Sequence, residues 1–335
     1  MISVPPSVLA SLAPRYGTHA EALAPFGGGR PENDGVVYAY PSGEGRLLLK
    51  VMAIPAEARR RGLLSLDERL RFAHYLGTHG APIAYPRPST LGNLYETLDA
   101  EGHAWVAYGM EIVPGITFRP VAWDPTLFRN WGQAVGMMHR LAREYPSWRA
   151  AVDPETGEEY LTWREEWQGF HDWCRDPEVR AAWIALKEEL EQLPVARDSF
   201  GFTHNDPHLF NLLVDGVRGN AVTILDFDVA NHHWFINDIA IACQTLLFAQ
   251  SGGLDRPATR REKLLGFLSL FMEGYVREHQ LAPEWLDRLD LFIAYRRILL
   301  YIVMYDEVRR RPPYRNAWRG MILARPEVAG RFSGV

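Results

Sequence analysis

Short runs of β-branched and aromatic residues, separated by turn residues, fill the first third of the chain and predict a sheet. Residues 34–40 and 46–52 flank the turn PSGEG and predict a β-hairpin. Residues 93–115 predict two further antiparallel strands around the turn DAEG. The stretch 25–34 precedes the hairpin, and we expect it to form a loop because it is too polar and too rich in Gly for a strand interior.

Helical spacing of apolar residues dominates the rest of the chain. Residues 65–80 predict one helix within the sheet region, with Ser65 as its N-cap and Gly80 as its stop. Further helices are expected at 126–145, 163–174, 178–193, 236–250, 261–279 and 284–309, and one strand at 221–229. The pattern therefore predicts an α+β protein with a sheet domain at residues 1–112 and a mainly helical domain at 113–335.

The composition is that of a soluble globular protein. With 335 residues the chain exceeds one typical hydrophobic core, which favours two lobes. Its formal net charge of −5 offers no basic surplus, so no nucleic-acid partner is expected. Two cysteines, Cys174 and Cys243, are too few for a disulfide framework or a cysteine-built zinc site. A reducing cytoplasm is the expected location.

No segment has the pattern of a membrane anchor. Pro5 and Pro6 interrupt the region where a signal peptide needs a continuous apolar run. The apolar run at 298–305 is much shorter than the ~20 residues that a bilayer requires. We therefore expect no membrane partner.

Five polar side chains crowd the stretch FTHNDPHLFNLLVDG at residues 202–216: His204, Asn205, Asp206, His208 and Asn211. A metal-hydrolase cluster, a kinase catalytic loop and an ordinary polar turn all fit such crowding. A zinc site would draw on Asp206, His208 and the later pair His232–His233, but no further ligand is placed beside them.

The kinase alternative explains more of these residues. Phosphoryl transfer needs a carboxylate to accept the proton of the attacking hydroxyl, and an oxygen-ligand pair to hold Mg²⁺. His204, Asp206 and Asn211 have the spacing of a kinase catalytic loop, and Asp226 follows in the strand-like run TILDF. Each residue alone is also typical of a turn or a satisfied polar side chain. Their joint order favours the kinase.

With these residues in place, the sequence resembles the aminoglycoside phosphotransferase and choline-kinase-like family, which has the bilobal protein-kinase-like fold. The family loop H-G-D-L-H-x-x-N corresponds to HNDPHLFN here, and the resemblance covers about residues 20–305. ENDGVVYAY, EIVPG, GQAVGMMHRL and WFINDIA resemble the bacterial branch that holds stress-response kinase and homoserine kinase-like proteins. Asn205, Pro207 and Phe210 depart from the usual Gly, Leu and Gly.

The resemblance implies roles for the loop. Asp206 would be the catalytic base, and His204 a structural residue that supports the loop. His208 would approach the γ-phosphate. Asp238 would tie the loop to the helix that follows it.

It also implies a metal site. Asn211 and Asp226 would bind Mg²⁺. Asp228 would either assist a second ion or only orient the residues around the first.

The nucleotide, ATP or another nucleoside triphosphate, would contact the sheet domain. Lys50 would reach the α- and β-phosphates, and its expected partner is Glu68, unless Ser65 and Glu68 only form a capping box. The backbone of Gly27, Gly28 and Gly29 would cover the phosphates, and that of Glu111 and Val113 would bind adenine.

The acceptor site would lie between the catalytic loop and the C-terminal helices. Candidates are Trp234, Glu273, Tyr275, Tyr295, Arg296 and Tyr301. Aromatic residues at helical spacing are more typical of a core than of a pocket. Asp228, Asp238 and Glu273 hardly form the acidic cluster that polycationic aminoglycosides need, whereas the two arginines of IAYRRILLY favour an acceptor with a carboxylate or phosphate.

The expected function is therefore an ATP- and Mg²⁺-dependent phosphotransferase, a monomer or homodimer, acting on a hydroxyl of a small molecule such as an antibiotic or metabolite. A protein Ser/Thr kinase-like enzyme is disfavoured because no activation-loop-like segment separates Asp226 from Asp238. A catalytically silent nucleotide-binding regulator is disfavoured because Lys50, Asp206 and Asn211 are retained with Asp226. A metal-dependent hydrolase ranks third.

Overall fold

The computed structural model describes residues 3–29, 31, 35–43, 45–117, 123–251, 257–325 and 327–330, without the side chains of 246–251 and 257–260. The fold is α+β, as the sequence predicts. The chain forms two compact units. The first comprises residues 1–115 and 223–228, and the second comprises residues 116–222 and 229–335.

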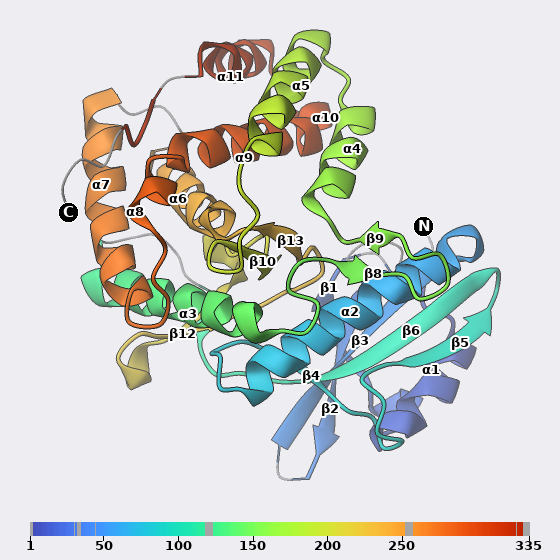
Figure 1. Cartoon of the computed structure of the whole chain (residues 1–335). Coiled ribbons are helices and arrows are strands. Elements are labelled where there is room, and N and C mark those ends of the chain that lie inside the picture. Colours follow the sequence, from blue (N-terminus) through green and yellow to red (C-terminus); the bar gives the residue numbers. More distant parts are fainter. Residues whose placement is uncertain are drawn as a thin grey trace. The chain divides into compact units, whose positions relative to one another are not determined.

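An antiparallel sheet forms the centre of the first unit, with strand order β1-β2-β3-β6-β4 and β5 paired to β6 (Figure 1). Its strands are β1 (Ala24–Gly28), β2 (Val36–Ser42), β3 (Gly45–Pro55), β4 (Pro86–Arg87), β5 (Glu96–Ala100) and β6 (His103–Glu111). The predicted hairpin is confirmed by the pairing of β2 with β3, which places Lys50 opposite Val37. The second predicted pair is confirmed by β5 and β6.

Strand β1 corrects the expectation of a loop before the hairpin. Residues 24–28 pair with β2, with a shift in register between Pro25 and Gly27. Every residue of β1 is exposed, so the strand buries no apolar side chain and needs none. A polar, Gly-rich composition speaks against a buried strand but not against an exposed strand at the edge of a sheet. The rest of the expected loop, Arg30 and residues 32–34, lies outside the described residues.

Helix α2 (Arg59–Thr78) begins earlier than predicted. Ser65 is an interior residue of the helix and not its N-cap, so the proposed capping box with Glu68 is wrong. Leu66 and Leu70 bury their side chains against β6, as the helical spacing predicts. The first turn was missed because its charged residues show no apolar spacing.

A second helix of the first unit, α1 (Pro6–Leu12), was not predicted. Val8 and Leu12 are fully buried and pack in one core cluster with Trp105 of β6. Seven residues are too few to show a helical period reliably.

Helices make up most of the second unit (Figure 1). They are α3 (Pro125–Glu144), α4 (Trp163–Trp173), α5 (Pro177–Glu191), α6 (Phe235–Ser251), α7 (Pro257–Tyr275), α8 (Pro283–Leu286), α9 (Leu289–Val303), α10 (Tyr305–Val308) and α11 (Pro312–Ala324). The segment 284–309, expected as one helix, is divided among α8, α9 and α10. The sequence did not predict the breaks because they fall at residues other than Gly or Pro. Helix α11 was not predicted.

Helices α3 and α7 pack closely against each other. A Cβ added at Gly132 would lie 1.8 Å from the carbonyl oxygen of Phe271, and one at Gly136 would lie 2.6 Å from that of Tyr275. Only glycine allows the two backbones to approach this closely. Asp124 caps α3 by accepting a hydrogen bond from Leu127 N–H at 3.0 Å.

The remaining strands are short. They are β7 (Ile116–Thr117), β8 (Ala151–Val152), β9 (Glu159–Tyr160), β10 (Phe200–Thr203), β11 (Leu212–Asp215), β12 (Ala221–Ile224) and β13 (Asn231–Trp234). Strand β10 pairs antiparallel with β13, and β11 lies between β7 and β12. The strand expected at 221–229 ends at Ile224, because Asp226 has a φ of +67°, which is not extended.

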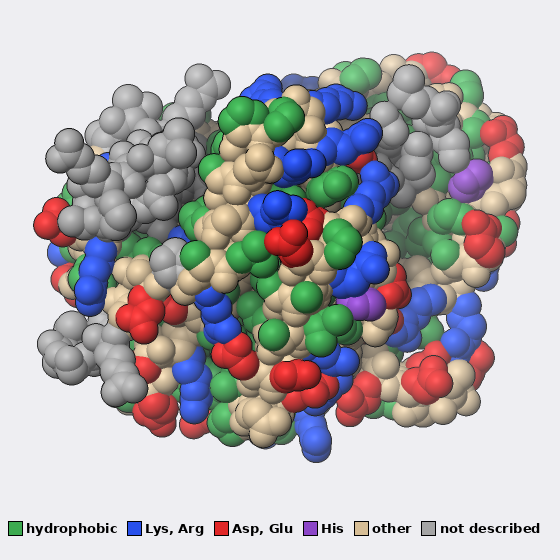
Figure 2. All heavy atoms as spheres, turned by 90° about the horizontal axis from the view of Figure 1, so that it is seen from above, with side chains coloured by type: hydrophobic (Ala, Val, Ile, Leu, Met, Phe, Trp, Pro, Cys, Tyr) green, Lys and Arg blue, Asp and Glu red, His purple; other side chains and the backbone are tan. Residues whose placement is uncertain are grey.

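Within the part of the chain that the structure describes, no helix is both long and apolar enough to cross a bilayer. On the face shown in Figure 2, Lys and Arg side chains are interspersed with Asp and Glu side chains. This mixture accords with the nearly balanced composition.

Candidate active site

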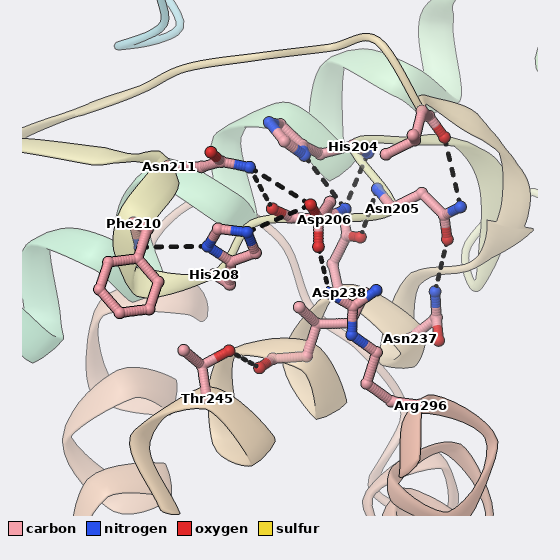
Figure 3. Close-up of polar contacts among 12 residues, drawn as sticks. His204, Asn205, Asp206, His208, Phe210, Asn211, Asn237, Asp238, Thr245 and Arg296 are labelled. Carbon is pink, nitrogen blue, oxygen red and sulfur yellow. Dashed lines mark hydrogen bonds and ion pairs between the residues drawn. The ribbon is translucent and has the colours of Figure 1, made fainter. Parts of the chain in front are cut away.

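The segment 204–208 leaves the end of the buried strand β10 and turns at once. Asn205 has a φ of +65°, in the left-handed region. His204 is 1% exposed, and its Nδ1 accepts a hydrogen bond from the backbone N–H of Asp206 at 3.2 Å (Figure 3). The imidazole therefore supports the turn from inside, the structural part that the resemblance implied for it.

Asp238, in the first turn of α6, anchors the backbone of this turn. Its carboxylate accepts hydrogen bonds from the N–H of His204 at 3.1 Å and of Asn205 at 2.8 Å (Figure 3). It also lies 3.1 Å from Nε2 of the buried His139, and since a carboxylate only accepts, that nitrogen carries the proton. His139 Nδ1 contacts the Tyr275 hydroxyl at 2.8 Å. Asp238 thus ties the loop to α6.

Three side chains hold the Asp206 carboxylate. Arg296 of α9 forms an ion pair with Oδ1, while His208 Nε2 lies 3.2 Å and Asn211 Nδ2 lies 3.4 Å from Oδ2 (Figure 3). Burial alone would raise the pKa of Asp206, but the hydrogen bond with His208 and the charge of Arg296 lower it below its ordinary value. Asp206 is therefore an ionised, oriented carboxylate at neutral pH.

The tautomer of His208 follows from its contacts. Its Nδ1 accepts the N–H of Phe210 at 3.1 Å and caps a short 3-10 helix (Leu209–Asn211). In the neutral ring Nε2 then carries the proton and donates to Asp206. His208 is thus a partner of Asp206 in this structure.

Asn211 places its amide nitrogen against the same residue. Nδ2 donates to the backbone oxygen of Asp206 at 3.0 Å. This bond and the contact with the Asp206 carboxylate both use the amide nitrogen, and no bond to the amide oxygen of Asn211 is seen among the described residues. This oxygen is the atom that would ligate a cation.

Lys50 and Asp228 meet in the first unit. Lys50 on β3 is 7% exposed and forms an ion pair with Asp228, whose Oδ1 also lies 3.3 Å from the Tyr108 hydroxyl. Burial alone would lower the pKa of Lys50, but Tyr108, Asp228 and Asp226 outweigh it and raise the pKa. Glu68 of α2 was the expected partner of Lys50, but the ion pair that the structure shows for Lys50 is with Asp228.

Asp226 differs from Asp228 in its surroundings. Its side chain is exposed, and its Oδ1 accepts the N–H of Asp228 at 3.3 Å. Between them, Phe227 is buried and packs edge-on against Phe72 of α2, with ring centroids 6.2 Å apart. The packed Phe227 holds the two carboxylates in different environments, one exposed and one paired with Lys50.

The remaining residues expected to contact the nucleotide lie at the ends of β1 and β6 or just after them. Gly27 and Gly28 end β1, and Gly29 donates its N–H to the Gly35 oxygen at 2.8 Å. Glu111 ends β6, and its carboxylate pairs with Arg87. Val113 follows β6 as a partly buried residue.

Most of the acceptor candidates are core residues. Side chains no more than 1% exposed are those of Trp234, Tyr275, Tyr295 and Tyr301. Glu273 pairs with Arg129 at the surface. Arg296 alone of the six contacts Asp206, as far as the described residues show. Sequence reasoning missed Glu166, which bonds to the loop from α4; nothing in its local pattern marks it.

The surroundings of the histidines do not favour a zinc hydrolase. Both ring nitrogens of His232 contact backbone oxygens, those of Leu161 at 2.8 Å and Ser147 at 2.6 Å. Within the described ranges, no group of three or more His, Cys, Asp or Glu side chains is placed to hold a metal ion.

Comparisons with known proteins point in one direction. The sequence pattern of the phosphotransferase enzyme family matches residues 25–279. Amicoumacin kinase of Bacillus subtilis (strain 168) is 27% identical over 302 residues, which cover 89% of this chain and 84% of that protein.

Two solved structures share the fold. The amicoumacin kinase hAmiN, in complex with AMP-PNP, Ca²⁺ and Ami, superposes with a TM-score of 0.77 at 24% identity, covering 92% of this chain and 90% of that one. A microcompartment-associated aminopropanol kinase has a TM-score of 0.64 at 19% identity, with 93% of each chain covered.

Proposed function

Because the chain belongs to the phosphotransferase enzyme family and is a small-molecule kinase, we propose that it moves the γ-phosphate of ATP, or of another nucleoside triphosphate, to a hydroxyl of a small molecule with the help of Mg²⁺. Family membership was the expectation that the loop HNDPHLFN raised, and the match over residues 25–279 confirms it. The nucleotide, the cation and the acceptor are the parts that we propose.

The state of Asp206 is the observation that carries this proposal. Its pKa is held below the ordinary value, and its two oxygens are oriented by Arg296, His208 and Asn211. Such a carboxylate can accept the hydrogen bond, and then the proton, of an acceptor hydroxyl at neutral pH. We propose Asp206 as the catalytic base, with His208 between this carboxylate and the γ-phosphate.

We propose Asn211 and Asp226 as ligands of the divalent cation. Mg²⁺ prefers oxygen ligands, and these residues offer an exposed carboxylate and an amide oxygen to which no hydrogen bond is seen among the described residues. The cation would neutralise charge on the nucleotide phosphates. The ion pair of Asp228 with Lys50 favours an orienting role for Asp228 over direct binding of a second ion.

The first unit would bind the nucleotide. Lys50, already charged and partly fixed by Asp228, would contact the α- and β-phosphates. Backbone contacts are proposed for Gly27, Gly28 and Gly29 with the phosphates, and for Glu111 and Val113 with adenine. For Glu68 we propose a supporting position near Lys50.

Amicoumacin is the first acceptor to test, because a kinase named for it is 27% identical over most of both chains. Amino alcohols come next, because an aminopropanol kinase shares the fold. Aminoglycosides, macrolides, homoserine-like amino acids and sugars complete a panel of hydroxyl compounds.

A nucleotide-consumption screen tests the proposal. Purified protein with ATP and Mg²⁺ is incubated with each compound, and ADP formation is measured against a reaction without acceptor. We expect at least one compound to stimulate ADP formation and to gain the mass of one phosphoryl group. Tight nucleotide binding without stimulation by any compound would contradict the proposal and favour a regulator.

A further inference from the structure

Asn205 stands where the family loop has glycine, and its side chain is bonded on every polar atom. It is 4% exposed, and its φ of +65° is one that glycine adopts without strain. Its Oδ1 accepts from Asn237 Nδ2 at 2.8 Å (Figure 3). Its Nδ2 donates to the Val229 oxygen at 3.3 Å and to Glu166. The amide therefore acts as a cross-link between the loop and other elements.

Glu166 of α4 is the carboxyl end of that cross-link. Its Oε2 accepts from Asn205 and, at 3.3 Å, from Asn231 Nδ2, and its Oε1 accepts from the Tyr295 hydroxyl at 2.7 Å. Burial raises the pKa of Glu166, while hydrogen bonds from Tyr295, Asn205 and Asn231 and the charge of Arg296 act against this rise. The geometry gives the carboxyl group three donors that hold it in place.

Helix α9 connects this cross-link with the base itself. Tyr295 bonds to Glu166, and the next residue, Arg296, pairs with Asp206. Arg296 thus holds Asp206 directly, and Tyr295 holds Asn205 through Glu166. The hydrogen bonds shown between Asp238 and the loop come from backbone N–H groups, whereas the connection to α4 runs through the Asn205 side chain.

We propose that Glu166 is a positioning residue for phosphate transfer, which holds Asn205, and through it the Asp206 carboxylate, in the reacting position. The inference rests on the proposed function. A glycine at 205 would adopt the same backbone conformation but leave the turn without this connection. Small displacements of a reacting group lower rates strongly, so the connection acts on turnover more than on nucleotide binding.

The test begins with Glu166→Gln, which keeps the shape but turns one acceptor atom into a donor. With the amide nitrogen at the Oε2 position, Asn205 and Asn231 both lose this acceptor. With the nitrogen at the Oε1 position, the Tyr295 hydroxyl has to turn and accept instead of donating. We expect kcat at saturating ATP and acceptor to fall about ten- to hundredfold, with the Kd for ATP unchanged within about twofold. Wild-type kcat in Glu166→Gln would overturn the proposal.

A double-mutant cycle with Asn205→Gly distinguishes positioning through Asn205 from a general effect of Glu166. If Glu166 acts through the Asn205 amide, Glu166→Gln lowers kcat less than about twofold in the Asn205→Gly background. The same fold-loss in both backgrounds would overturn the route through Asn205.

Glu165→Gln is the matched control. Glu165 is the neighbouring carboxylate on α4, and its Oε2 accepts from the Leu161 N–H at 2.9 Å at the start of the helix. We expect this variant to lower Tm and leave kcat unchanged. A fall of Tm without loss of kcat in Glu166→Gln as well would make Glu166 merely structural and overturn the proposal.

Hydrogen exchange of the backbone amides of His204 and Asn205 can be measured without knowing the small molecule that accepts the phosphate. In the full-length protein with ATP and Mg²⁺, we expect faster exchange of these amides in Glu166→Gln but not in Glu165→Gln. Unchanged exchange in Glu166→Gln would contradict the inference whatever the activity. If wild type transfers phosphate to no compound, the proposed function fails, while faster exchange still supports the positioning of the loop by Glu166.

Discussion

Arg296 of α9 forms an ion pair with Oδ1 of Asp206, the carboxylate proposed as the base. A buried cation in contact with a base stabilises its ionised form and lowers its proton affinity. Arg296 therefore sets the pH range in which Asp206 is ready to accept a proton, as well as its orientation.

Replacing Arg296 by Met should move the acid limb of the pH–rate profile upward. The pKa of Asp206 is below its ordinary value in the wild type, so the base is ionised down to low pH. Without the cation this pKa rises, and activity is lost at a higher pH as the solution is acidified. The measurement is kcat/KM for the acceptor between pH 4 and 8. Superimposable profiles would exclude the effect, and Arg309→Met, at an exposed ion pair, is the control.

Removing the anchor Asp238 should affect both stability and activity. Asp238→Asn turns one acceptor atom into a donor, which leaves a loop N–H or His139 without its partner. We expect a loss of about 2–4 kcal/mol in the free energy of unfolding of the second unit and a fall in kcat. Urea denaturation and turnover measure the two. Asp172→Asn, at an exposed carboxylate of α4, should change neither.

Lys50→Met should reveal whether the ion pair with Asp228 serves stability or the nucleotide. Removing only the lysine leaves a partly buried carboxylate unpaired, so Tm falls. Adding Asp228→Asn should restore most of the Tm but not the turnover, because the Lys50 ammonium group proposed to contact the phosphates is still missing. Recovery of turnover in the double variant would contradict the assignment. Lys187→Met, at a surface pair with Glu191, should leave the Kd for ATP unchanged.

Gly28 and Gly27 provide a matched pair on β1. Gly28 has a φ of +90°, and an added Cβ would lie 2.5 Å from the Gly35 oxygen, whereas a Cβ at Gly27 meets nothing within 4 Å. Gly28→Ala should therefore cost about 1–3 kcal/mol and weaken ATP binding, while Gly27→Ala should change little. Thermal unfolding and nucleotide titration measure both effects. Equal effects of the two substitutions would contradict this account of β1.

The sequence predicted the elements whose apolar residues recur with a clear period. Lys50 was expected on a hairpin strand, and Leu66 and Leu70 on a buried helix face, and both expectations hold. Strand β1 was missed because it lies at an exposed edge, where pairing of backbone groups stabilises the strand without any apolar side chain.

The catalytic-loop residues could be recognised because their spacing is local. His204, Asp206 and Asn211 lie within eight residues of the chain and contact one another through Asp206, so their order in the chain reflects their arrangement in space. Glu166 and Arg296 reach the same loop from α4 and α9, and only the tertiary fold brings them there. Arg296 was among the acceptor-site candidates, but its pairing with Asp206 was not predicted, and nothing along the chain marks Glu166.

Transfer of labelled γ-phosphate from ATP to the acceptor that the screen identifies, in wild type and in Asp206→Asn, is the most direct test of Asp206 as the base. The substitution keeps the size of the side chain and removes the carboxylate. We predict that transfer falls by at least about a hundredfold while the Kd for ATP stays within about twofold of wild type. Transfer at the wild-type rate in Asp206→Asn would contradict the account.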